Sequence, residues 1–162
     1  MDFAEMVCQQ LEQSFGRVKA SVADITDEEA RRTLAGRLTP IVWQLGHIAT
    51  VDGNFVRRAG GTYAPPARYV DLFKAGTGGE AAYPPLEEVL AYAVTAHEAL
   101  FAAAWEADYT KPAESERGNF HTVGQMLIFA NQHRGYHVGK MTTLRALLGK
   151  PILFGPTPVK GR

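Results

Sequence analysis

The amino-acid sequence predicts an all-α protein, a four-helix bundle that forms a single domain over residues 1–162. Four segments carry apolar residues at helical spacing, and no segment alternates between apolar and polar residues as a half-buried strand does. Apolar residues make up 46% of the chain and charged residues 21%, which is typical of a globular protein. A chain of this length buries about two-thirds of the surface that its unfolded form exposes, so it can fold without a covalent staple.

The first expected helix runs from about Phe3 to Ala23. The single cysteine, Cys8, lies within it, so no internal disulfide can form, and we expect its side chain to be a small buried hydrophobe. A short helical piece follows, in which Thr26 and Glu29 have the spacing of a capping box. Apolar residues define one side of the first helix: Phe3, Met6, Val7, Leu11, Phe15, Val18 and Val22.

The second expected helix begins with Thr39 as N-cap and Pro40 as its first residue. It continues to about Ala59 and ends at Gly60–Gly61, since glycine commonly terminates helices.

The third helix is expected over about Pro85–Glu106, and the fourth over Thr122–Leu148. Thr122 and Gln125 have the spacing of another capping box. Three prolines and three glycines follow in residues 150–162, which predicts an irregular tail.

The connection over residues 60–84 is long and rich in Gly, Pro and Tyr. Neighbouring parallel helices need a crossover as long as the bundle, and this connection is long enough to make one. We therefore expect an up-down-down-up bundle with the crossover between the second and third helices. The aromatic residues of the connection either cover a pocket or pack against the bundle: Tyr63, Tyr69, Phe73 and Tyr83.

Charge and hydropathy exclude several classes of protein. The 17 basic and 17 acidic residues cancel, which argues against a broad nucleic-acid interface. No apolar stretch approaches the length of about 20 residues that a membrane span requires. No signal-peptide pattern is visible at the N-terminus, so we expect a cytoplasmic protein.

Two of the five histidines, His133 and His137, share one face of the fourth expected helix. Their separation of four residues places them within about 40° of each other. Their neighbours on that face are apolar, so both side chains should point into the core. Such a pair can chelate one metal ion. The alternative is two core histidines whose ring nitrogens form hydrogen bonds within the protein.

The other three histidines lie in different settings. His47 sits at the shoulder of the apolar stripe on the second helix, which permits but does not require that it reach the interior. His97 falls within the stripe of the third helix, as a partner of metal ligands, a fourth ligand, or a core histidine bonded to a backbone carbonyl. His121 precedes the fourth helix and is expected to face solvent.

Two parts of the chain resemble a known family. The runs Gln132–Met141 and Leu144–Pro151 are similar to the last helix of DinB-like proteins, and Trp43–Ile48 is similar to their second helix. The resemblance implies an up-down-down-up four-helix bundle with a metal site made by three histidines.

On this sequence the resemblance assigns the metal ligands to His47, His133 and His137. It also implies a Zn or Ni ion, although the donor set admits Fe or Cu. Lys140 departs from the family, many members of which carry Gln there. Its amine either approaches the site and holds an anionic substrate group, or extends to solvent along a packed stem.

Three neutral imidazoles leave coordination positions open, which is typical of catalytic metal sites. The resemblance therefore implies a metal-dependent enzyme, either a thiol-dependent S-transferase or a hydrolase, acting on a small thiol or electrophile. No residue is assigned a catalytic role. Asp52 lies about 140° from His47 on the helix and is a poor general base, whereas Tyr136 and Asn54 lie nearer the relevant faces.

Two other hypotheses remain open at the level of sequence. The chain is a metal-binding stress-response protein without catalysis, or a metal-free helical module that works by dimerising. The family resemblance is compatible with a homodimer.

Overall fold

The computed structural model describes residues 2–36, 38–78, 81–116 and 118–154. Within these ranges the fold is all-helical, as predicted, and the extended backbone amounts to two isolated bridges. The described helices are α1 (Phe3–Val22), α2 (Asp27–Arg31), α3 (Ile41–Arg58), α4 (Ala67–Phe73), α5 (Leu86–Trp105) and α6 (Val123–Leu147).

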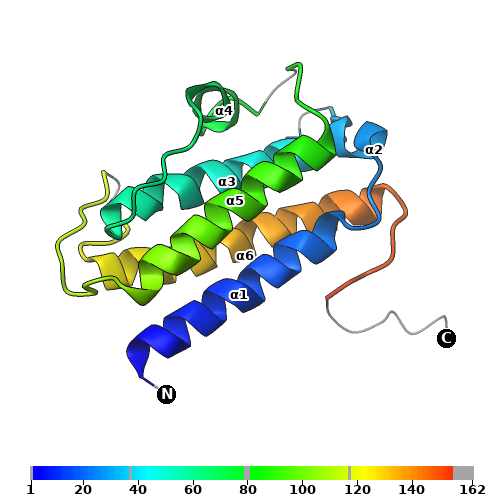
Figure 1. Ribbon diagram of the computed structural model, residues 1–162. Coiled ribbons are helices and arrows are strands. Elements are labelled where there is room, and N and C mark those ends of the chain that lie inside the picture. Colours follow the sequence, from blue (N-terminus) through cyan, green and yellow to red (C-terminus); the bar gives the residue numbers. More distant parts are fainter. Residues whose placement is uncertain (1, 37, 79–80, 117, 155–162) are drawn as a thin grey trace, which may run out of the picture.

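The four long helices pack side by side, and the two short ones lie at the margins (Figure 1). The most extensive contact is between α3 and α5, and α1 packs against α6. Contacts of α3 with α6 and of α1 with α5 complete the bundle. The helix α4 lies on the outer side of α3 (Figure 1).

Two apolar clusters form the core, one toward each end of the bundle. Phe15 and Ile48 belong to the first cluster, and Leu11 and Phe55 belong to the second. The helix positions between the clusters carry buried polar side chains, among them Asp52, His97 and Arg134. The bundle therefore has a polar layer at mid-height, and this layer contains the candidate site.

Two predicted caps differ in detail from the structure. The α3 helix begins at Ile41 with Pro40 as its N-cap, so Thr39 is not the capping residue. The Thr39 hydroxyl instead accepts a hydrogen bond from the Gln44 side chain, which competes with the cap. The Thr26–Glu29 capping box of α2 is present as predicted.

At the start of α6, Thr122 caps the helix by accepting from the backbone N–H of Gln125. The second half of the predicted box is wrong by one residue, because the Gln125 side chain accepts from the backbone N–H of His121. This hydrogen bond joins the connection before α6 to the first turn of the helix. Of the predicted irregular tail, residues 155–162 lie outside the described residues.

The connection over residues 60–84 is not wholly irregular, because α4 forms within it after Pro66. Its glycines and prolines lie outside the helix and obscure it in the sequence. Tyr69, Phe73 and Tyr83 are buried in the first apolar cluster, with the rings of Phe73 and Tyr83 stacked 6.0 Å apart. Packing, rather than a loose cover, therefore accounts for these aromatic residues. No helix in the described ranges is long and apolar enough to span a membrane.

Candidate metal centre

Three histidines from two helices converge at mid-height of the bundle. His47 comes from α3, and His133 and His137 come from consecutive turns of α6. One ring nitrogen of each lies within 4.8 Å of those of the other two. The Nε2 atoms of His133 and His137 are 3.1 Å apart. The structure thus brings together the three residues that the family resemblance named.

The orientation of His47 is set by its neighbours. Its Nδ1 lies 2.7 Å from the carbonyl oxygen of Phe73, and a carbonyl only accepts, so Nδ1 carries the proton. The Trp43 ring stacks on the other side, with ring centroids 4.7 Å apart and planes 7° from parallel. The Nε2 lone pair of His47 is therefore available to a metal ion.

The Phe73 contact depends on a glycine next to His47. A Cβ atom at Gly46 would lie 2.5 Å from the Phe73 ring, closer than packed atoms approach. Gly46 therefore lets α4 sit directly on α3, which places the Phe73 carbonyl against His47. Phe73 was not predicted in this role, because α4 itself was not predicted.

His137 is oriented by a glutamine. Its Nδ1 lies 2.5 Å from Oε1 of Gln44, which is 1% exposed. The amide nitrogen of Gln44 donates to Thr39, so Oε1 faces His137 and Nδ1 of His137 is the donor. The Nε2 atom of His137 then carries a lone pair that can bind a metal ion. Gln44 was not among the predicted site residues, although its i, i+3 spacing from His47 places both on one face of α3.

His133 completes the group, and its Nδ1 is buried without a hydrogen-bond partner among the described residues. Burial lowers the pKa of His133 to about 3 and that of His137 to about 2, and the neighbouring imidazoles reinforce this. Burial likewise lowers the pKa of His47. All three rings are therefore neutral at neutral pH, which is the form that binds metals. The donor set, its spacing and the tautomers of His47 and His137 fit one divalent ion.

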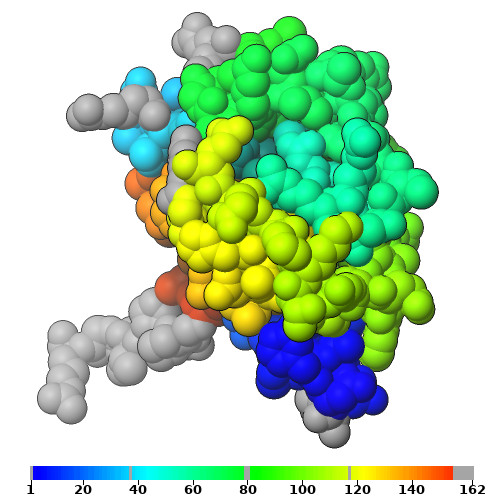
Figure 2. Space-filling view, turned by 90° about the vertical axis from the view of Figure 1, so that its left-hand side faces the viewer, coloured from blue at the N-terminus to red at the C-terminus, as the bar shows by residue number. Residues whose placement is uncertain are grey.

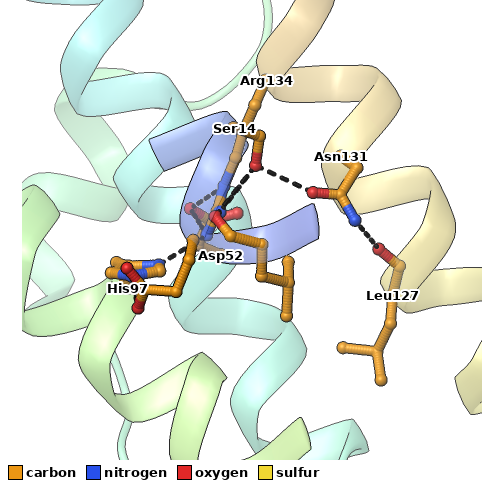
Figure 3. Close-up of polar contacts among 8 residues, drawn as sticks. Ser14, Asp52, His97, Leu127, Asn131 and Arg134 are labelled. Carbon is orange, nitrogen blue, oxygen red and sulfur yellow. Dashed lines mark hydrogen bonds and ion pairs between the residues drawn. The ribbon is translucent and has the colours of Figure 1, made fainter. Parts of the chain in front are cut away.

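A second group of polar side chains is centred on Arg134, the residue after His133 (Figure 3). Arg134 and Asp52 form an ion pair with 2.8 Å between Nη2 and Oδ2, and both side chains are fully buried. Arg134 also donates to the backbone oxygen of Leu11 and to the hydroxyl of Ser14. Asp52 is thus engaged with Arg134, in agreement with the prediction that it is a poor general base.

His97 belongs to this second group rather than to the metal centre. Its Nδ1 accepts from Arg134 at 3.2 Å (Figure 3). Its Nε2 donates to Glu12 at 3.0 Å. His97 is therefore neither a fourth ligand nor bonded to a backbone carbonyl. Side chains from α1 and α6 form hydrogen bonds with both of its ring nitrogens. His121 is exposed, as predicted, and pairs with Glu114 at 2.7 Å.

The remaining predicted residues surround the site at different depths. Tyr136 is 60% exposed, with its ring 5.0 Å from that of His137. The Lys140 amine lies 4.4 Å from the centre of the Tyr136 ring and is exposed. This agrees with an amine that extends to solvent. Asn54 lines a hollow that also reaches His47.

That hollow has a volume of about 340 Å³ and opens beside His47 and His133. Residues of α3, of the connection before α6 and of the N-terminal half of α6 form most of its walls. A small molecule can therefore reach the histidines from this side.

Comparison with known proteins places the chain beside one family. A family model described as the DinB superfamily matches residues 10–141, a span that contains all three histidines. No curated protein matches the sequence.

Proposed function

The chain belongs to the DinB superfamily, and from this premise we propose that it binds one divalent metal ion through His47, His133 and His137 to catalyse a group transfer. The observation that carries the proposal is the convergence of three neutral imidazoles within 4.8 Å of one another. Zinc and nickel are the favoured ions, and iron or copper would suit the same donors.

We also infer that the bundle that presents this site has up-down-down-up order. Two contacts support parallel α1 and α6, because Ser14 bonds Asn131 and the later Ser21 bonds the later Arg145. The first apolar cluster contains early residues of both α3 and α5, such as Leu45 and Val89, and the second contains late residues of both, such as Phe55 and Leu100. This supports parallel α3 and α5, which a crossover through residues 60–84 would connect.

The chemistry follows from the open side of the site. A divalent ion held by three imidazoles lowers the pKa of a bound water or thiol, which makes either one a nucleophile near neutral pH. The Phe73 carbonyl and Gln44 hold two of the imidazoles in place. Of the described residues around the hollow, Glu116 is the carboxylate, and it lies on an exposed connection.

With Glu116 as the carboxylate near the site, thiol transfer is favoured over hydrolysis. A thiolate has already lost its proton and needs no general base when it attacks. The thiol sulfur would form a bond to carbon of an electrophile as the bond to the leaving group breaks. The leaving group departs with the electron pair, and the thiol proton passes to solvent. A hydrolase remains the second candidate. In it Glu116, which lines the hollow, would act on a water molecule there.

The metal proposal is tested by elemental analysis of protein purified without a histidine tag. Wild type should hold about one equivalent of metal. His133→Ala should hold less than about a tenth of that, since it leaves two of the three protein ligands that catalytic zinc sites use. The matched control is His121→Ala, which removes an exposed histidine outside the site. Equally low metal in wild type and His133→Ala would refute the proposal and favour a metal-free module.

Catalysis is tested separately with metal-loaded protein, low-molecular-weight thiols and a panel of alkylating electrophiles. Turnover that requires both metal and thiol supports an S-transferase. Turnover without thiol supports a hydrolase, and no turnover with either supports a metal-binding protein of the stress-response type. A cytoplasmic location and a homodimer complete the proposal, and light scattering of the purified protein tests the dimer.

A further inference from the structure

The hollow beside the histidines has two chemically different walls. Figure 2 faces this end of the molecule, where the connection before α6 (yellow) lies beside α3 (blue-green) with the α4 segment (green) above them. One wall is aromatic, and the other carries polar side chains of α3. A ligand that fills the hollow would meet both.

The aromatic wall leads toward the metal centre. The rings of Phe120 and Phe129 lie 5.6 Å apart, and the Phe129 ring lies 6.0 Å from that of His133. Phe55 closes this wall from α3, with its ring 5.5 Å from Phe120 at a steep angle. Aromatic faces of this kind contact the apolar part of a ligand.

The polar wall contains a cation that is already held in position. Arg58 is exposed at the end of α3, and its Nη1 donates to the backbone oxygen of Glu114 at 3.0 Å. Its guanidinium carbon lies 5.9 Å from the centre of the Phe120 ring. A guanidinium has five N–H donors, so one hydrogen bond to a carbonyl leaves donors for a bidentate contact with an anion. Asn54, one helical turn before Arg58, adds an amide on the same side.

We propose that this hollow is the substrate site and that it takes a small amphipathic carboxylate. The apolar body packs on Phe120 and Phe129, the carboxylate binds Arg58, and the reactive end lies toward His47 and His133. The volume of about 340 Å³ is at the lower end of ligand pockets, which suits a molecule of modest size. The assignment of a substrate rests on the proposed function, whereas the binding of the carboxylate does not.

Glu116 lines the same hollow and offers the opposite charge. Arg58 is favoured as the anchor because the Phe120 ring and the Glu114 carbonyl hold it. An amine probe can decide between the two charges directly.

The test uses titration calorimetry of the zinc-loaded full chain with 4-phenylbutanoate, its neutral amide and 4-phenylbutylamine. We expect the carboxylate to bind at least about tenfold more tightly than the other two probes, and Arg58→Gln to remove that preference. The matched control is Arg57→Gln, which makes the same change one residue earlier, in a different hollow. It should alter the carboxylate affinity by less than twofold.

Three outcomes would overturn the proposal: equal effects of Arg58→Gln and Arg57→Gln, tighter binding of the amine that Glu116→Gln abolishes, or no binding of any probe. Repeating the titration after removal of zinc by a chelator separates this inference from the proposed function. Arg58-dependent binding by a chain that takes up no zinc supports the carboxylate site and refutes the metal proposal. Zinc uptake without Arg58-dependent binding refutes the carboxylate site alone.

Discussion

His47 and His137 each donate one ring N–H to an acceptor in the protein, and this decides which nitrogen each can offer to a metal. The acceptors are the Phe73 carbonyl and the Gln44 side chain. Removal of a group that orients a ligand in this way commonly lowers metal affinity by about 10- to 100-fold. At the scale of single residues, the site therefore depends on more than its three histidines.

Replacement of Gln44 by leucine tests this dependence. Gln44→Leu keeps the bulk but leaves Nδ1–H of His137 without an acceptor, so zinc affinity should fall about 10- to 100-fold. Gln44→Glu retains an acceptor and should bind zinc at least as tightly as Gln44→Leu. Competition with a chromophoric chelator measures the affinities.

The matched control is Gln132→Leu, an identical change at an exposed position of α6. Equal affinities for Gln44→Leu and Gln132→Leu would show that Gln44 does not orient His137.

His97 should make the stability of the metal-free protein depend on pH. Burial, followed by the charge of Arg134, lowers the pKa of His97 from 6.5 to about 4. Between these values the unfolded chain binds a proton that the folded protein does not, so stability is lost as pH falls from 6.5 toward 4. Each such group contributes about 1.4 kcal/mol per pH unit to the free energy of unfolding.

Urea unfolding of wild type and His97→Gln between pH 4.5 and 7 measures the effect. The free energy of unfolding should fall less steeply with decreasing pH in the variant than in wild type. His121→Gln serves as control, because it removes an exposed histidine. The same slope for both variants would contradict the prediction.

At the scale of elements, α4 is part of the metal centre although it supplies no ligand. Its last residue, Phe73, contacts Gly46 with its ring and His47 with its carbonyl oxygen. Thr77, just beyond α4, accepts from the indole N–H of Trp43 at 3.1 Å. The position of α4 and the orientation of His47 are therefore coupled.

A methyl group at Gly46 should separate the two elements. In Gly46→Ala the new Cβ would meet the Phe73 ring at 2.5 Å, so the variant should lose about 1–3 kcal/mol of unfolding free energy. Zinc affinity should fall as well, since His47 loses its acceptor. Urea unfolding and chelator competition measure the two effects.

Gly16→Ala is the control, because a Cβ at Gly16 on α1 meets no atom within 4 Å. It should be neutral or stabilise by up to about 1 kcal/mol, the usual gain of alanine over glycine in a helix. A stable Gly46→Ala with unchanged zinc affinity would show that α4 does not hold His47.

At the scale of the whole molecule, the polar layer interrupts the core between its two apolar clusters. The buried Arg134–Asp52 ion pair joins α6 to α3, and Arg134 also reaches α1 through Leu11 and α5 through His97. Buried ion pairs are weak sources of stability, because the desolvation of both charges offsets their attraction. A metal ion bound in the same layer would stabilise the folded state, because it binds the folded protein and not the unfolded chain.

Zinc should therefore raise the unfolding temperature. At 1,000 times its dissociation constant, a ligand stabilises the folded state by about 4 kcal/mol. In a domain of this size, 1 kcal/mol corresponds to roughly 2–4 °C, so the expected shift is about 8–16 °C. Thermal unfolding with zinc and with a chelator measures it.

The comparison needs two controls. Magnesium should give little shift, since it prefers oxygen ligands. His133→Ala should respond to zinc weakly or not at all. An equal response of wild type and His133→Ala would place the zinc elsewhere on the molecule.

The sequence by itself determined the helical class, the limits of the long helices to within a residue or two, and the shared face of His133 and His137. Periodicity and capping residues are local signals, and His133 and His137 share a face because of helix geometry alone. His47 was identified through family resemblance, since its place at the edge of an apolar stripe did not distinguish a ligand from a bystander.

The tertiary structure alone decided what surrounds those histidines. The Phe73 carbonyl, the Gln44 side chain and the Arg134–Asp52 pair each contact a group far away in the chain, and no periodicity encodes such a contact. His97 shows the same limit, because its core position was predicted while its partners, Glu12 and Arg134, come from two other helices. Helical periodicity fixes the face on which a side chain lies, and only the packing of the helices decides what that side chain meets.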